Sequence, residues 1–155
     1  MGRRKVCRGR RATSKDGKEW ADAPETKATD TLVDVAFGNA VFVGVGLHGL
    51  RTSTADGVKW TAKQTGEEGE HLNSVVFAGG KFVAVGAGAT YTSADGEKWE
   101  RAVNEDAPQF ATHGAGAFVG AAWKGRLFTS KDGVSWQETH KADRHVLAVA
   151  FSTVG

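Results

Sequence analysis

The chain has 155 residues, which is within the size of one domain and long enough to bury a core. Its 20 basic and 18 acidic side chains give a formal net charge of +2, which singles out no class of partner. The single cysteine, Cys7, excludes an internal disulfide. No apolar run reaches the length of about 18 residues that would predict a membrane span.

Residues 1–8 are basic and are expected to form an unstructured leader. Six basic residues lie between Arg3 and Arg11, ahead of any acidic residue, and the rest of the chain carries four more acidic than basic side chains. No aromatic residue is interleaved with the basic ones, so we do not expect nucleic-acid binding. The leader lacks the apolar core of a secretory signal. The compartment is therefore unassigned, and an extracytoplasmic location of a parent protein stays open.

Short β-branched and apolar runs, separated by glycine-containing turns, predict strands along the rest of the chain. Residues 9–23 predict only the third and fourth strands of a repeating unit. The next unit is complete and spans residues 32–63. Its expected strands are 32–37, 41–45, 50–53 and 59–63. Asp56-Gly57 is the kind of dipeptide that joins two antiparallel strands through a tight turn.

The same order of strands and turns recurs in residues 72–103 and 109–140, and residues 146–151 predict one further first strand. No stretch has an apolar face at helical spacing, so the chain is predicted to be all-β. The inner strands are apolar at alternate positions and also at many of the positions between them, as with Val35 and Ala36. This pattern is typical of a sheet that is covered on both faces.

Four-stranded sheets that recur every 40 residues or so and pack face to face are the blades of a β-propeller. The chain is therefore predicted to hold three complete blades with a partial blade at each end. We expect a fragment of a larger propeller. The alternative is a closed ring in which the N-terminal hairpin and the C-terminal strand share a fourth blade. Uncovered end blades would favour self-association.

One phrase marks every unit: a serine or threonine, one residue, Asp-Gly, two residues and a tryptophan. The tryptophans of the four copies lie 40, 39 and 37 residues apart. The phrase resembles the Asp-box (BNR) repeat of sialidase-like propellers and is similar to the repeats of the photosystem II assembly-factor type. The resemblance covers nearly all of the chain after Arg10 and implies a β-propeller.

The repeated phrase is interpreted as a structural turn, because aspartate caps a tight turn and the following glycine adopts a positive φ. A binding site would need one copy to differ from the others. The tryptophans are expected to fold back over their hairpins and to pack between blades. The residues assigned to this role are Asp16, Gly17, Trp20, Asp56, Gly57, Trp60, Asp95, Gly96, Trp99, Asp132, Gly133 and Trp136.

The loops that connect the second strand to the third, and one blade to the next, lie at the same end of the blades. Loops on a rigid scaffold often carry function. Trp123 stands out there as the one tryptophan outside the repeated phrase. The predicted binding residues are His48, His71, Trp123, Lys124, Arg126 and His145.

No metal or cofactor is expected. The five histidines lack the paired spacing of zinc sites, and no glycine-rich loop precedes a helix. His113 occupies the position that Phe37, Phe77 and Phe151 hold in the other units, so it is interpreted as a residue at the edge of the core.

The resemblance to sialidase-like propellers implies a test for catalysis. Such enzymes need an arginine cluster and a tyrosine nucleophile paired with a glutamate. The only tyrosine, Tyr91, is placed in the third-strand position of Arg51 and Phe128, which suggests packing, and Arg51, Arg101, Arg126 and Arg144 share no position. No catalytic residue is assigned. The favoured function is a non-catalytic module that binds a protein or a glycan. The alternative is part of a sialidase-like glycoside hydrolase whose catalytic residues lie on other blades.

Overall fold

The fold is taken from a computed structural model of the whole chain, which describes residues 6–8, 12–22, 31–61, 63–104 and 106–152. Within these residues the only helical element is η1, a single 3-10 turn at Trp123–Gly125. No helix of the described part is long and apolar enough to cross a membrane.

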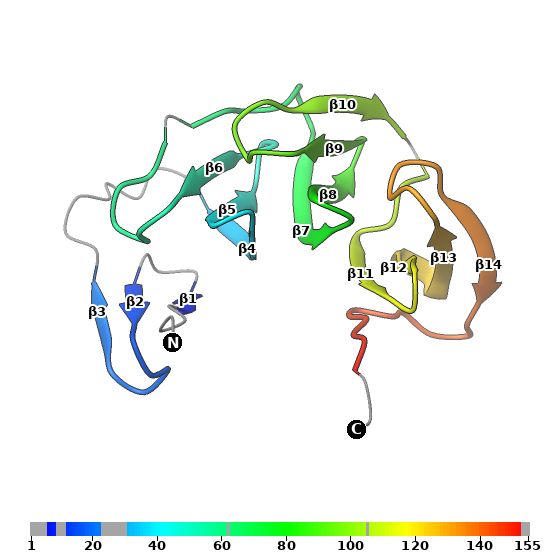
Figure 1. Cartoon of the computed structure of the whole chain (residues 1–155). Helices are drawn as coiled ribbons and strands as arrows, with labels where there is room; N and C mark the ends of the chain where they lie inside the picture. The colour runs from blue at the N-terminus through cyan, green and yellow to red at the C-terminus, as the bar shows by residue number, and fades with distance from the viewer. Residues whose placement is uncertain (1–5, 9–11, 23–30, 62, 105, 153–155) are drawn as a thin grey trace.

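The described strands form four separate antiparallel sheets, arranged along an open arc (Figure 1). In each sheet the strands follow one another in sequence order, as in the blades of a β-propeller. The first two sheets have three strands each: β1 (Val6–Arg8), β2 (Ala12–Ser14) and β3 (Trp20–Asp22), then β4 (Leu32–Gly38), β5 (Val41–Gly46) and β6 (Arg51–Thr54). The other two have four strands each: β7 (His71–Ala78), β8 (Lys81–Ala87), β9 (Ala89–Ser93) and β10 (Glu100–Val103), then β11 (Phe110–Gly114), β12 (Ala117–Ala121), β13 (Arg126–Ser130) and β14 (Gln137–Lys141).

The Asp-Gly turns share one set of hydrogen bonds, which the turn after β13 illustrates. The Ser130 hydroxyl donates to Asp132 Oδ1 at 2.9 Å and accepts the Gly133 amide at 2.9 Å. Asp132 Oδ1 also accepts the amides of Val134 and Ser135 at 2.8 and 2.7 Å. The glycine has a φ of 75°, which a side chain would oppose. The turns at Asp16, Asp56 and Asp95 repeat these bonds.

Neighbouring sheets approach closely at these turns. A Cβ on Gly96 would lie 2.6 Å from Cγ2 of Val43, and a Cβ on Gly133 would lie 2.8 Å from Cγ2 of Val83. In each case the turn glycine of one blade meets the second strand of the preceding blade. Glycine is therefore required at the turn for its backbone angle and also for the space between blades.

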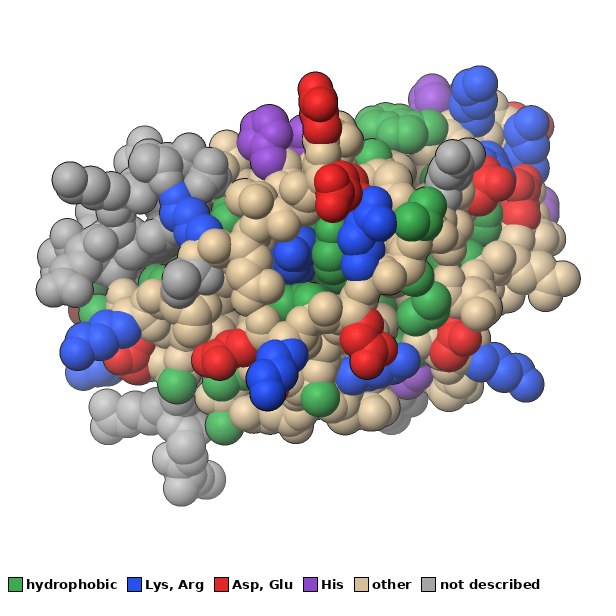
Figure 2. Space-filling model, turned by 90° about the horizontal axis from the view of Figure 1, so that it is seen from above, with side chains coloured by type: hydrophobic (Ala, Val, Ile, Leu, Met, Phe, Trp, Pro, Cys, Tyr) green, Lys and Arg blue, Asp and Glu red, His purple; other side chains and the backbone are tan. Residues whose placement is uncertain are grey.

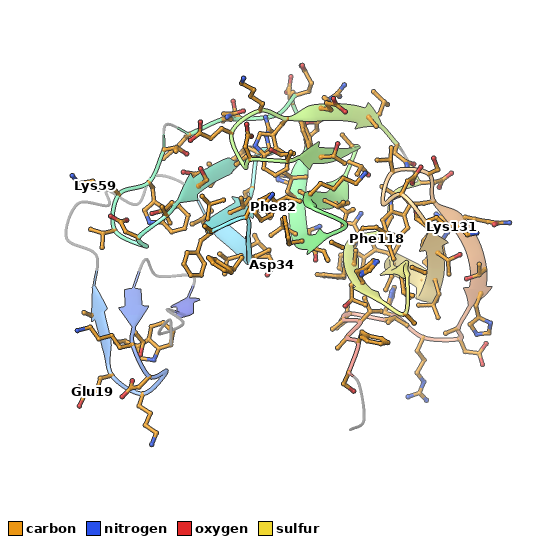
Figure 3. All side chains as sticks on the ribbon, viewed as in Figure 1. Glu19, Asp34, Lys59, Phe82, Phe118 and Lys131 are labelled. Carbon is orange, nitrogen blue, oxygen red and sulfur yellow. The ribbon has the colours of Figure 1, made fainter. Side chains whose placement is uncertain are left out.

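The core lies between the sheets, in two buried clusters that share the third sheet. Phe82 packs with Val43 and Val45 on one side, whereas Phe118 packs with Val83 and Val85 on the other. Figure 3 labels Phe82 and Phe118 in these two interfaces. Both faces of the inner strands β7 and β8 are thus covered, which confirms the expectation drawn from their apolar pattern.

A phenylalanine–glycine contact joins the innermost strands. A Cβ on Gly38 would lie 2.1 Å from Cγ of Phe77, one blade further along. The same relation recurs between Gly114 and Phe151, at 2.0 Å. Phe77 also pairs across its own sheet with Phe82, with ring centroids 4.8 Å apart. His113 pairs in the same way with Phe118, at 4.6 Å, so its assignment to the position of these phenylalanines is confirmed.

The described residues within 59–63 belong to no strand, and residue 62 lies outside the described part. The Ser53 amide donates to the Thr61 hydroxyl at 2.9 Å, the Thr61 amide donates to the Ser53 carbonyl at 2.8 Å, and an isolated bridge joins Arg51 to Gln64. The side chain thus takes a bond that a strand would make with its backbone. As a result, the β4–β6 sheet has three strands and not four.

The two ends of the arc also differ from the predictions. Val6–Arg8 forms β1 and pairs with β2, so these three residues do not belong to an unstructured leader. The rest of the predicted leader, residues 1–5, lies outside the described residues. Residues 146–151 form no strand, because a ladder needs a second strand and no described segment pairs with them. The contact of Phe151 with Gly114 nevertheless places this segment where an innermost strand would lie.

We predict that Gly38→Ala destabilises the protein by about 1–3 kcal/mol, because the new methyl group would overlap the Phe77 ring. Urea unfolding measures the effect. The control is a double-mutant cycle with Phe77→Ala, which costs stability alone but removes the overlap. Equal effects of Gly38→Ala in the presence and in the absence of the Phe77 ring would contradict the contact.

Candidate functional site

The candidate site lies on the loop face, which we define as the β5–β6 loop (47–50), the β12–β13 loop (122–125) and the two histidines that contact these loops, His71 and His145. In the side-on view of Figure 2, histidines gather along the upper rim, with hydrophobic and basic side chains toward its right end. Five of the six predicted residues fall into two groups there, each held by contacts between a histidine and a loop.

The first group joins the β5–β6 loop to the start of β7. The His48 amide donates to Nδ1 of His71 at 3.1 Å, and the two rings meet edge to face with centroids 5.4 Å apart. His48 has a φ of 59°, which lies in the left-handed region. The histidine of one blade therefore caps the loop of the preceding blade.

The second group repeats this arrangement at the β12–β13 loop. The Lys124 amide donates to Nδ1 of His145 at 2.9 Å, and Lys124 has a φ of 61°. The His145 ring lies edge-on to Trp123, with centroids 5.9 Å apart. Trp123 remains 55% exposed, whereas the four tryptophans of the repeated phrase are half-buried.

Arg126 is paired with two acidic side chains. Its guanidinium bonds to Glu138 at 2.7 Å and to Asp106 at 3.0 Å, and it lies 4.8 Å from the ring centre of Phe128. The bonds to Glu138 and Asp106 raise the pKa of Arg126. The structure thus places this predicted residue beside the site, as a support of the β13–β14 hairpin.

A hollow of about 410 Å³ opens next to the second group. It is lined by Lys124, Lys141, Ala142, Asp143, Arg144 and His145. The Ala142 amide donates to the Gly125 carbonyl at 2.8 Å, which ties the segment after β14 to the β12–β13 loop. Three of the charged residues here, Lys141, Asp143 and Arg144, were missed by the sequence analysis, since they lie at or just after the end of the last strand and belong to no repeated motif.

A second polar cluster is buried between the β4–β6 and β7–β10 sheets. Glu70 accepts the Tyr91 hydroxyl at 2.5 Å and the Arg101 guanidinium at 2.6 and 2.9 Å. The Arg51 guanidinium lies over the Tyr91 ring, 4.0 Å from its centre. A Cβ on Gly66 would lie 2.3 Å from Glu70 Oε2, so the connecting segment packs directly on the cluster.

The protonation states in this cluster follow from its contacts. Burial opposes the charge of Glu70, but the bonds from Tyr91, Arg101 and the Glu67 amide outweigh it and lower its pKa. Burial and the bond to Glu70 raise the pKa of Tyr91. Burial lowers the pKa of Arg51. The cluster therefore holds an ionised carboxylate and a neutral phenol.

The placement of Tyr91 in the sequence analysis was wrong. Tyr91 pairs with Ala84, which makes it equivalent to Thr52 and Phe128 and not to Arg51. Counted from the turn hydroxyl, which is Thr54 in the β4–β6 unit and Ser93 in the β7–β10 unit, Tyr91 is equivalent to Thr52. The sequence analysis found no shared position for Arg51 and Arg101. In the structure Arg51 lies over the Tyr91 ring and Arg101 bonds to Glu70, so both belong to one cluster.

Glu70 and Tyr91 are each only 3% exposed. A substrate would not reach them while the sheets are packed, so the cluster joins two blades. Among the described residues, no three side chains of histidine, cysteine, aspartate or glutamate lie close enough together to hold a metal ion.

Comparisons with known proteins agree with this architecture. The sequence profile of the DUF6242 beta propeller domain matches residues 18–112. No curated protein matches the chain. Many solved structures share its fold, and three of them illustrate the likeness. YCF48 bound to D1 peptide is 24% identical, with a TM-score of 0.56 over 71% of this chain and 41% of that one.

The second structure, YCF48 from Cyanidioschyzon merolae, is 20% identical, with a TM-score of 0.57 over 75% of this chain and 38% of that one. The third, the GH74 enzyme of Niastella koreensis, is 17% identical, with a TM-score of 0.55 over 71% of this chain and 18% of that one. At these identities the likeness shows the fold alone. The chain spans about 40% of the length of the two YCF48 structures.

We predict that Glu70→Gln lowers the free energy of unfolding by about 1–3 kcal/mol at neutral pH, because Arg101 and Tyr91 lose a charged acceptor. The lowered pKa means that Glu70 stabilises the fold above its unfolded pKa, and that this stabilisation is lost as the pH falls. The difference between variant and wild type should therefore shrink below about pH 4.

Urea unfolding at neutral and acidic pH measures both effects, with the exposed neighbour Glu68→Gln as the matched control. A stability difference for Glu70→Gln that is the same at both pH values would contradict the ionised state of Glu70.

Proposed function

Because the chain belongs to the DUF6242 beta propeller domain family, we propose that it is a non-catalytic binding module that holds a protein segment on its loop face. The proposal includes the repeat type: the shared bonds of the four turns support an assignment to the Asp-box class. Fold alone does not fix function, so the argument for binding rests on the site itself.

Trp123 is the observation that carries the proposal. A large aromatic side chain that is 55% exposed, on loops held by a rigid scaffold, is typical of an anchor for a partner. The 3-10 turn at 123–125 and the bond from Lys124 to His145 hold this loop in one conformation. A preorganised loop loses little entropy when a partner binds, which favours affinity.

A peptide is the class of ligand with the best support. One solved structure of the same fold, YCF48, is described as bound to a D1 peptide. The hollow next to Trp123 is open and has a size suited to a few side chains. A glycan could also stack on tryptophan, but no comparison supports one, so glycans enter as an alternative outcome of the test.

The hydrolase alternative finds no support in the accessible residues. Tyr91, Glu70 and the two arginines are the residue types that a sialidase-like site would use, and they do lie together. Their burial between two sheets favours a structural role, since catalysis requires contact with the substrate.

Selection of random peptides displayed on phage against the whole chain tests the proposal. We expect the enriched peptides, synthesised and measured by calorimetry, to lose at least about tenfold in affinity with Trp123→Ala, equivalent to about 1.4 kcal/mol. The matched control is Val103→Ala, which removes another exposed apolar side chain from the outer strand β10.

Failure to enrich any peptide, or peptides that bind Trp123→Ala as tightly as the wild type, would contradict the proposal. Binding in a glycan array that depends on Trp123 would replace the protein partner with a sugar.

A further inference from the structure

The hollow beside Trp123 holds the one group of unpaired positive charges on the loop face among the described residues. Lys124, Lys141 and Arg144 are exposed and form no ion pair within the described part of the chain. The only acidic residue in the lining is Asp143. By contrast, Arg101 and Arg126 are neutralised by Glu70, Glu138 and Asp106.

His145 adds a hydrogen-bond donor of known position. Its Nδ1 accepts the Lys124 amide at 2.9 Å, so a neutral imidazole must carry its proton on Nε2. That N–H is not used in any bond within the described residues. The lining thus offers ammonium, guanidinium and imidazole donors, and a single carboxylate as an acceptor.

The backbone beneath the hollow is tightly packed. A Cβ on Gly125 would lie 2.3 Å from the Ala142 carbonyl oxygen and 2.5 Å from that of Arg144, and Gly125 has a φ of 73°. The β12–β13 loop and the segment after β14 are therefore held together, and their basic residues line the same hollow. Fixed donors bind an anionic group more strongly than mobile ones do.

From this arrangement we infer that the hollow binds a carboxylate group of an acidic peptide segment, while an adjacent apolar side chain of that segment packs on Trp123. The inference rests on the proposed function and names the chemistry of its ligand. Arg144 has the planar fork that suits a carboxylate, and the two lysines supply charge around it. The carboxylate is assigned to an acidic side chain of the peptide. The test below distinguishes this source from a C-terminal carboxylate and from free anions.

Fluorescence anisotropy of short labelled peptides on the whole chain tests this inference. The probe is a glutamate- and leucine-containing peptide with an amidated C-terminus. Its counterpart carries glutamine in place of glutamate, and a third peptide is the glutamine version with a free C-terminal carboxylate. We expect only the first to bind, with an affinity that falls as salt is added.

Arg144→Gln should weaken binding of the glutamate peptide about tenfold, and Lys124→Gln should weaken it in the same direction. The matched control is Lys131→Gln, which makes the same change of charge at an exposed position beyond the far end of β13 (Figure 3). Binding to Lys131→Gln should equal that of the wild type.

Equal binding of the glutamate and glutamine peptides, or an Arg144→Gln variant that binds like the wild type, would overturn the inference. Preferential binding of the peptide with the free C-terminus would overturn the assignment to side chains, and competition by inorganic phosphate at equal concentration would assign the site to free anions. These results leave the proposed function intact if the selected peptides still depend on Trp123, so the two failures are distinguishable.

Discussion

The close approach of neighbouring sheets is the constraint on which the rest of the structure depends. Each small sheet has two apolar faces and cannot bury them alone, so it must stack on its neighbours. The contacts of Phe77 with Gly38 and of Gly96 with Val43 set how near two blades can come. Larger side chains at those glycines would separate the sheets and open the core to water.

This stacking also explains the geometry of the loop face. Because successive blades are held in register, the residue that precedes an innermost strand meets the loop of the blade before it. His71 and His145 occupy this position, and each accepts a backbone amide from a residue with a left-handed conformation. The proposed binding surface is thus assembled between repeats, and neither repeat alone contains it.

Much of the fold could be predicted from the residues. The spacing of the Asp-Gly phrase predicted the repeat, and the apolar residues on both faces of 72–85 predicted a sheet covered on both sides. The equivalence of His113 with Phe77 followed from alignment of the units. These features succeed because each depends on a local pattern that recurs with every blade.

The features that were missed depend on contacts outside the repeat. Glu70 lies in the segment between two blades, and its bonds to Tyr91 and Arg101 follow from stacking. The described residues of the strand expected at 59–63 form none, since the Thr61 hydroxyl takes the bond of the Ser53 amide. The basic hollow joins residues 141–145 to a loop of the same blade, and no spacing along the chain signals that meeting.

Nuclear Overhauser contacts between methylene and ring protons test the stacking of the blades most directly. The account predicts a strong contact between the Gly38 α-protons and the ring protons of Phe77, because these groups touch across two sheets. The absence of that contact in a folded, strand-rich sample would contradict the face-to-face packing from which the loop face follows.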